Sequence, residues 1–429
     1  MLKRGKRFVP VLLGLVLSVL STGCGKEPEE KVEITLMHGW GGNLDTHKTM
    51  QSIYEDFEKN NPDIILNCIP YSDSSIAVEK ANDMLAVEKM PDIISTNGLS
   101  YYVQNAVKRD MALDLMPYIQ EDEEFKAMIH PSVYENWETA GGHLYTIPDA
   151  LEVAGYWYNK NYMKAAGLTD ANGEVQEPET WEEFLTMTEQ LAKWTDESGE
   201  DICVCALDQL QKVEFLFPAR LAGEGTDGYA SVNRTSVKVD ANVLEPVMRD
   251  IGTICARSRT VENIENARQE FMDGKSVIYF NGIWESKSLM EKMKQDDIGY
   301  SAYPCSNSQK LAYISVSSGY VLAKQKNAKK EEACIRFLKY MLSREVQQKL
   351  VVSTGQMPSN PEIDRSEIWK ENPVLADAID KMYGADVQIK MIRSVWSESR
   401  VNIVEKYIEQ GKYGAEDARK MAAELAYCE

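Results

Sequence analysis

The spacing of apolar residues predicts alternating strands and helices near the start of the chain. Val32–Met37 alternates apolar and polar side chains, which is typical of a strand, and His47–Asn60 carries apolar residues at helical spacing. A strand at Ile64–Ile69, a helix at Ile76–Lys89 and a strand at Met90–Ile94 continue the pattern. This order of elements predicts a parallel sheet with helices on both faces.

The rest of the chain continues the α/β pattern. Thr180 and Glu183 form a capping box, so a helix should begin between them. Phe271–Tyr279 belongs to a second α/β block, and Ala328–Val352 has the spacing of one long helix. Because 429 residues exceed what one small core can organise, we expect an α/β chain of two lobes.

The N-terminus has the order of residues found in export signals. Four basic residues open the chain, and the apolar run Phe8–Leu20, a few small residues and Cys24 follow them. The run is too short to span a bilayer comfortably. The segment resembles the bacterial lipoprotein signal, although Ser21 stands where that signal prefers leucine. We therefore expect a signal peptide at 1–23, a lipidated Cys24, and a charged stalk at 24–31.

The charge of the chain excludes one class of partner. Lys and Arg total 47 against 67 Asp and Glu, which gives a net charge of −20. Because so acidic a surface repels phosphate backbones, we expect no nucleic-acid partner.

The cysteines and histidines show no pattern of a disulfide framework or a metal site. Seven cysteines besides Cys24 are scattered without regular spacing, and none of the four histidines lies in a cluster with the spacing of metal ligands. We accordingly expect no disulfide, no metal and no cofactor.

A series of short segments resembles one protein family. It begins with Ile34–Gly42 and continues in order with Phe57–Pro62, Met90–Ile94, Gly142–Pro148, Tyr156–Lys160, Thr180–Phe184, Phe271–Trp284, Ser318–Tyr320 and Gly355–Pro358. Together they resemble the sugar-binding extracellular solute-binding proteins of ABC importers, the family that includes maltodextrin-binding proteins. The resemblance covers essentially the whole mature chain. Each segment is weak alone, but their shared order is specific.

The resemblance implies a fold and a role. The fold is the type II periplasmic-binding-protein-like α/β fold, with a ligand cleft between two lobes joined by hinge strands. Lobe 1 should comprise residues 32–150 and 315–357, and lobe 2 residues 151–314 and 358–429. The protein would be an exported, lipid-anchored monomer on the extracellular face of the cell membrane. It would bind a carbohydrate, pass it to ABC permease subunits, and catalyse no reaction.

Aromatic residues are the first candidates for contacts with a sugar, because pyranose rings present apolar faces that stack on aromatic side chains. Trp40 and Gly41 directly follow the first strand, where an open α/β sheet places its ligand crevice. The resemblance adds Trp284 and Trp396 as stacking residues. For each tryptophan, core packing is the competing interpretation.

Polar candidates complete the predicted site. Glu152 lies six residues before Tyr158, which is the spacing of a sugar-binding glutamate in maltodextrin-binding proteins. A carboxylate there would accept charge-assisted hydrogen bonds from sugar hydroxyls. The remaining candidates are loop or strand-end residues that could equally be solvated or structural: Asn97, Asp149, Glu214 and Asn281.

Other functions remain open at this point. An extracellular carbohydrate-active enzyme with two catalytic carboxylates is the main rival class, and 67 acidic residues always offer some plausible pair. A sensor lipoprotein could use the same binding fold. An anion ligand is disfavoured, because anion sites use helix N-termini and backbone donors instead of tryptophans.

Overall fold

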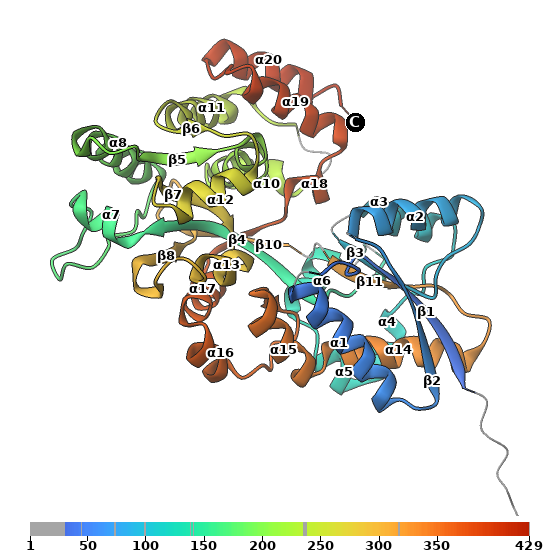
Figure 1. The fold of residues 1–429 in the computed structure, drawn as a ribbon. Coiled ribbons are helices and arrows are strands. Elements are labelled where there is room, and N and C mark those ends of the chain that lie inside the picture. Colours follow the sequence, from blue (N-terminus) through green and yellow to red (C-terminus); the bar gives the residue numbers. More distant parts are fainter. Residues whose placement is uncertain are drawn as a thin grey trace, which may run out of the picture.

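The computed structural model describes residues 31–428 except 44, 73, 98–99, 138, 140, 235–237 and 316–317. The predicted signal peptide, Cys24 and all but the last residue of the stalk lie outside the described residues. Two α/β lobes are connected by a long strand that runs from one to the other (Figure 1). The α/β fold class predicted from the sequence is confirmed.

The first lobe is built on a four-stranded sheet in the order β11-β3-β1-β2. Strand β1 pairs in parallel with β2 and β3, as the sequence pattern predicts, while β11 is antiparallel to β3. The strands span Val32–His38 (β1), Ile64–Pro70 (β2), Ile93–Asn97 (β3) and Ser318–Leu322 (β11).

Helices cover both faces of this sheet because alternate strand residues point to opposite sides. Ile34 and Leu36 of β1 share a buried cluster with residues of α1 and α14, whereas Met37 packs with α2 and α3 on the other face. The helices of this lobe include α1 (Asp45–Asn60), α2 (Ser74–Ala86), α3 (Ser100–Lys108), α4 (Met116–Gln120), α5 (Glu123–Ala127), α6 (Pro131–Trp137) and α14 (Ala328–Leu342).

The second lobe is built on a nine-stranded mixed sheet, whose main order is β13-β10-β4-β7-β5-β6. Strands β8 and β12 also pair with β4, and β9 pairs with β10. The strands span Ala150–Asn159 (β4), Cys203–Leu207 (β5), Arg259–Thr260 (β6), Ser276–Gly282 (β7), Ile298–Ser301 (β8), Tyr303–Pro304 (β9), Lys310–Ser315 (β10), Met357–Pro358 (β12) and Val387–Ile389 (β13).

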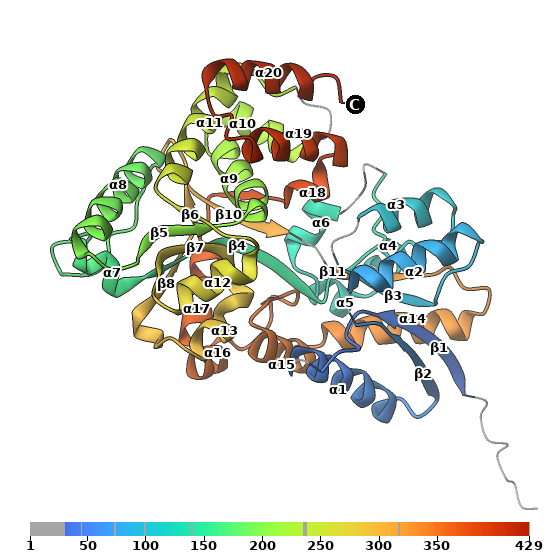
Figure 2. The same ribbon diagram turned by 45° about the horizontal axis from the view of Figure 1, so that its top comes forward.

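Helices pack around this second sheet (Figure 2). They are α7 (Lys160–Ala165), α8 (Trp181–Ser198), the π-helix η1 (Gln211–Leu216), α9 (Phe217–Ala222), α10 (Thr226–Asn233), α11 (Ala241–Ala256), α12 (Ile264–Met272), the 3₁₀ turns η2 (Ile283–Glu285) and η3 (Gln295–Asp297), α13 (Ser286–Met290), α16 (Arg365–Glu371), α17 (Pro373–Tyr383), α18 (Ile392–Val395), α19 (Glu398–Glu409) and α20 (Ala415–Leu425). The capping box of α8 forms as predicted, with the Thr180 hydroxyl accepting from the Glu183 amide.

The predicted long helix at Ala328–Val352 is instead two helices, α14 and α15 (Arg344–Thr354). Ser343 interrupts it with an extended ψ of 148°, and its hydroxyl accepts from the Val346 amide as the N-cap of α15. Apolar spacing continues across the break because both helices bury residues in one core, so periodicity alone did not reveal it.

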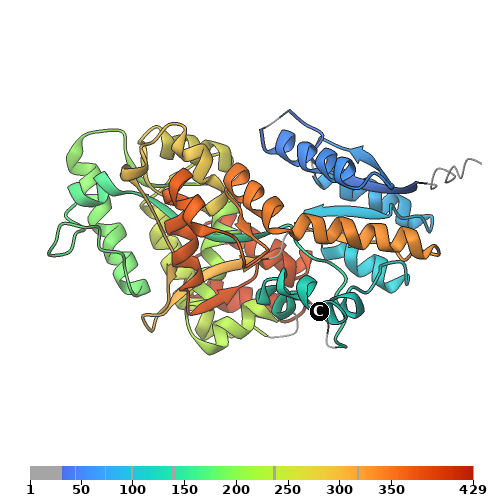
Figure 3. The same ribbon diagram turned by 90° about the horizontal axis from the view of Figure 1, so that it is seen from below.

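The chain crosses between the two sheets at three places, where the lobes meet side by side (Figure 3). The segment entering β4 forms a bridge from Ile147 to Tyr320 of β11 before joining the second sheet. Strand β10 of the second sheet precedes β11 of the first, and α15 leads into β12, where Met357 pairs with Leu151. These crossings place residues 147–152 at the junction of the lobes.

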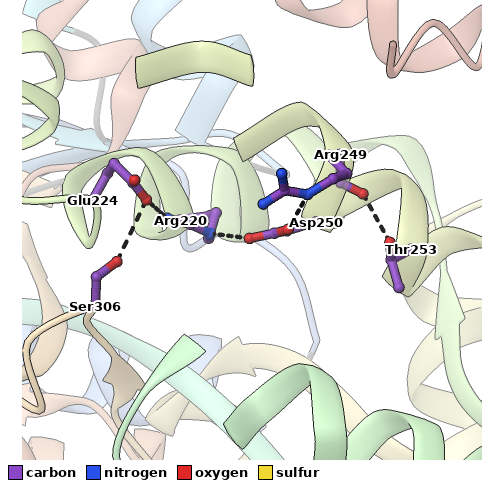
Figure 4. A network of polar contacts seen from close by, with 6 residues as sticks. All are labelled: Arg220, Glu224, Arg249, Asp250, Thr253 and Ser306. Atoms are coloured by element: carbon purple, nitrogen blue, oxygen red, sulfur yellow. Dashed lines mark hydrogen bonds and ion pairs between the residues drawn. The ribbon is translucent and has the colours of Figure 1, made fainter. Parts of the chain in front are cut away.

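A buried ion-pair network braces the outer part of the second lobe (Figure 4). The Arg220 guanidinium of α9 donates from Nε to Asp250 Oδ2 of α11 at 2.8 Å and pairs with Glu224, which also accepts from Ser306. Arg220 and Asp250 are both buried, so each supplies the counter-charge that the other needs away from water. All these contacts lie within one lobe, which makes the network structural.

Candidate functional site

The loop after β1 presents Trp40 at the carboxyl end of the first sheet. Its indole is half-buried against the core of the lobe, and the ring of His47 meets it edge-on at 5.5 Å between centroids. The indole N–H is buried without an acceptor among the described residues. A buried donor left unpaired calls for an explanation, and a bound water or ligand that accepts from it is one.

Gly41 is required here by a close approach of two backbone segments. Its amide donates to the Tyr71 carbonyl at 2.7 Å, and a Cβ at this position would lie 2.7 Å from the same oxygen. The sequence analysis placed Gly41 with Trp40 at the ligand crevice after the first strand. The structure supplies a different reason for glycine, which is contact with the chain after β2.

A continuous series of buried contacts leads from this loop to the junction of the lobes. The Trp40 amide donates to His38 Nδ1 at 3.1 Å, and the His38 and Tyr54 rings lie 5.0 Å apart. The hydroxyls of Tyr54 and Tyr320 are 3.2 Å apart, and Tyr320 donates to Asp149 Oδ2 at 3.0 Å. The site residues of the first lobe therefore form one connected unit.

Asp149 and Glu152 differ in their surroundings although only three residues separate them. Asp149 is 4% exposed, and its carbonyl accepts from Gln347 of α15 at 2.7 Å. Glu152 is partly exposed, and no described residue gives its carboxylate a hydrogen bond or an ion pair. Burial, and next the charge of Asp149, raise the pKa of Glu152 to about 7. Glu152 can therefore accept from a hydroxyl group and, when protonated, also donate to one.

Trp284 stands at the equivalent place in the second lobe, in the turn η2 directly after β7. Its ring lies over Gly282, where a Cβ would come within 2.1 Å of the ring atoms, and it is only partly buried. Its carbonyl faces Gly355 at the end of α15, since a Cβ on Gly355 would lie 3.3 Å away. Trp284 thus adjoins the α15 segment that also contacts Asp149.

Two of the predicted site residues are instead buried inside the second lobe. Trp396 is 2% exposed, and its Nε1 donates to the Ser231 carbonyl at 2.9 Å. The Asn281 amide donates to the Tyr279 hydroxyl at 2.5 Å and to Glu285 at 2.9 Å. Neither side chain has surface to offer a ligand, so their geometry favours a structural role over contact with a ligand.

Of the two other predicted residues, Glu214 is engaged in an ion pair, and the side chain of Asn97 is not described. The Glu214 carboxylate, buried in η1, forms an ion pair with Arg393, and Arg393 also pairs with Glu405. Burial raises the pKa of Glu214, with Arg393 opposing that effect. Asn97 ends β3, but its side chain lies outside what the structure describes.

Sequence reasoning missed several residues that hold the site together. Tyr54 lay within the helix predicted at His47–Asn60, and His38 lay within the segment Ile34–Gly42, both without an assigned role. Tyr320 lay inside a recognised segment without an assigned role. The available signal was polar aromatic residues at strand ends and on the face of a helix that packs on them, which is too common to be specific.

Metal and membrane features are missing from the described part of the chain. No three His, Cys, Asp or Glu side chains among these residues are grouped so that they could hold a metal ion. Within the same residues, no helix combines the length and apolar character needed to cross a bilayer.

Known proteins are similar to this chain in sequence and fold. Residues 52–377 match the sequence model of a family described as bacterial extracellular solute-binding protein. A multiple sugar-binding protein from Streptococcus mutans is 22% identical over 357 residues, covering 79% of this chain and 79% of that protein.

Solved structures support the same fold. A Streptococcus pneumoniae solute-binding protein, in complex with the blood group A-trisaccharide, covers 92% of this chain and 99% of its own length, with a TM-score of 0.72 and 19% identity. A probable secreted solute-binding lipoprotein from Streptomyces coelicolor covers 94% and 99%, with a TM-score of 0.74 and 12% identity. These likenesses confirm the two-lobe fold.

Proposed function

Because the chain belongs to the bacterial extracellular solute-binding proteins, we propose that it binds a carbohydrate, namely an oligosaccharide, between its lobes and delivers it to an ABC permease. The observation that carries this proposal is the unpaired, partly exposed Glu152 carboxyl at the junction of the lobes. The named sugar partners of the Streptococcus relatives support the same class of ligand.

The proposed site combines residues from both lobes. Trp40 and Trp284 supply apolar surface for the faces of the sugar, and Glu152 accepts from its hydroxyls. Asp149 supports the site from behind by raising the proton affinity of Glu152. The lobes in this proposal are residues 32–150 with 315–357, and 151–314 with 358–429. They close about the crossings at 147–152 as hinged bodies.

A binding role is favoured over hydrolysis by the state of the two acidic residues. Glycosidases need one carboxyl group as acid and a second, accessible one as base or nucleophile. Asp149 is buried and already accepts from Tyr320, so only Glu152 of this pair is accessible to a ligand. We therefore propose that the protein is not an enzyme. Incubation with oligosaccharides should yield no new products.

A panel of sugars tested by thermal shift is the experiment for this function. A bound ligand stabilises the folded state by mass action, so a matching oligosaccharide should raise Tm in proportion to log concentration above its Kd. Monosaccharides, phosphate and sulfate are tested in the same way as alternative ligands. A shift with the anions alone would replace the carbohydrate proposal with an anion-binding one.

Glu152→Gln tests the polar part of the site. Because a carboxyl with a pKa of about 7 is only partly ionised at neutral pH, the variant should weaken sugar affinity by about 1 kcal/mol, roughly fivefold. Because folding raises the pKa of Glu152, its ionisation destabilises the wild-type fold as pH rises from the unfolded pKa to about 7. Glutamine cannot ionise, so without ligand the variant should melt at a higher temperature than wild type at pH 8. Calorimetric titration and melting curves measure the two effects.

Glu174→Gln is the matched control, since Glu174 is an exposed glutamate that forms an ion pair with Lys164 on the second lobe. It should change neither affinity nor stability by a measurable amount. Unchanged affinity in Glu152→Gln for every sugar that binds would remove Glu152 from the site.

The N-terminal segment supports a lipid anchor on Cys24 as a further part of the proposal. A diacylated cysteine would tether a monomer to the outer face of the cell membrane, where a permease could receive its ligand. Cys24→Ala should leave the precursor uncleaved or release the protein from membranes, as immunoblots of fractionated cells would show. A mature-sized variant that still sediments with membranes would contradict the anchor.

A further inference from the structure

The loop that carries Trp40 is braced by three side chains. His38 Nδ1 accepts a hydrogen bond from the Trp40 backbone N–H at 3.1 Å. His47 Nδ1 accepts one from the Gly42 backbone N–H at 3.0 Å. Gln51 Nε2 donates to the carbonyl oxygens of the same two loop residues, at 2.5 and 3.2 Å. Each brace comes from β1 or α1, so a rigid strand and helix determine the shape of the loop.

From these contacts we infer that His47 is a positioning residue, which holds Trp40 for the sugar through the backbone of the loop and releases it when protonated. The inference rests on the proposed function, because it takes Trp40 to contact the ligand. It goes beyond that function by giving the site a built-in response to acidity.

The chemistry of imidazole explains the release. A ring nitrogen accepts a hydrogen bond only when it carries no proton, and both nitrogens are donors in the charged form. Protonated His47 would turn an N–H group toward the Gly42 N–H and lose the brace. The same ring also meets the Trp40 indole edge-on, so its movement reaches that side chain directly.

The surroundings favour the neutral form of both histidines. Burial lowers the pKa of His47 below its usual 6.5, and burial followed by the charge of His47 lowers the pKa of His38 to about 4. The other titratable groups in this series of contacts are Tyr54 on α1, Tyr320 on β11 and Asp149 before β4.

Mild acid acts on His47 before it acts on His38. His38 stays neutral through the mildly acidic range, because its pKa is about 4, so His47 is the histidine that responds first. The brace is complete at neutral pH and is lost as pH falls through the lowered pKa of His47. The contribution of this brace to sugar affinity should therefore be constant above pH 7 and fall in acid.

Three variants separate a brace from a general structural role. His47→Leu removes the acceptor, while His47→Asn places an amide oxygen near the position of Nδ1 and cannot titrate. His143→Leu is the matched control, since it removes another histidine whose Nδ1 contacts Asp114. Gln51 is kept in all three variants.

The first measurement needs no ligand. Hydrogen exchange of a peptide covering residues 38–43 should be about tenfold faster in His47→Leu than in wild type at pH 7.5, after correction for intrinsic rates. His47→Asn should recover most of the protection, and the control should match wild type. Equal exchange in all four proteins would overturn the inference.

The second measurement is a sugar titration at pH 7.5 and 5.5, using the tightest oligosaccharide from the thermal-shift panel. Wild-type affinity should fall several-fold in acid. The affinity of His47→Asn should fall less, by only the part that protonation of Glu152 causes. A pH profile that His47→Asn shares with wild type would overturn the inference. If no sugar binds at any pH, the proposed function fails, and the exchange measurement alone decides whether His47 braces the loop.

Discussion

Replacing Trp396 with alanine is expected to lower the free energy of unfolding by about 3–5 kcal/mol, because it deletes a large side chain from a packed interior. The indole is 2% exposed, and its N–H donates to the Ser231 carbonyl. The Arg400 guanidinium lies 4.1 Å above the ring, and Phe217 meets it edge-on. Truncation would leave a cavity and an unpaired carbonyl, which add to the lost burial. Urea unfolding followed by circular dichroism measures the change.

Trp369→Ala provides the control for this substitution. Trp369 is 45% exposed on α16, so its loss should change the free energy of unfolding by less than about 1 kcal/mol. A Trp396→Ala protein as stable as wild type, but with sugar affinity lowered tenfold or more, would reinstate Trp396 as the ligand residue that the resemblance implied.

Replacing Trp284 with alanine should have the opposite signature. We expect a loss of about 2 kcal/mol in sugar affinity, roughly 30-fold, since a central aromatic anchor contributes on this scale. The free protein should lose less stability than in Trp396→Ala, because the Trp284 ring is only partly buried over Gly282. Calorimetric titration with the best oligosaccharide of the panel, alongside urea unfolding, measures both quantities.

Trp284→Phe refines this experiment, because phenylalanine keeps an aromatic face but offers less area for stacking. Its affinity should lie between those of wild type and Trp284→Ala. A large loss of stability with unchanged affinity in Trp284→Ala would place this tryptophan in the core and remove it from the site.

Much of the fold could be predicted from local pattern. The parallel pairing of β1 with β2 and β3 followed from apolar spacing, and the start of α8 followed from a capping box. Both depend on residues close together in the chain. The division of one predicted helix into α14 and α15 could not be predicted. A serine such as Ser343 can lie inside a helix or cap the start of one, and its local sequence does not tell which.

The candidate site was predictable only in part. Sequence order identified Trp40, Trp284 and Glu152 as candidates, and the structure leaves their side chains at least partly exposed. The sequence could not distinguish the accessible Glu152 from the buried Asp149. The hydrogen bonds that engage Asp149 come from Tyr320 and Gln347, which lie far along the chain. Nor could the sequence reveal the brace by His47, because an imidazole acceptor is recognisable only beside its donor.

The sequence by itself therefore determined the fold class, the family and which chemical groups were available for a site. Tertiary structure alone decided which of those groups reach solvent. Trp396 and Ser231 are 165 positions apart, and only folding places the carbonyl that pairs with the indole. Burial is set by all neighbours in space, and most of those neighbours come from distant segments, so residues of the same type in similar local sequence acquire different roles.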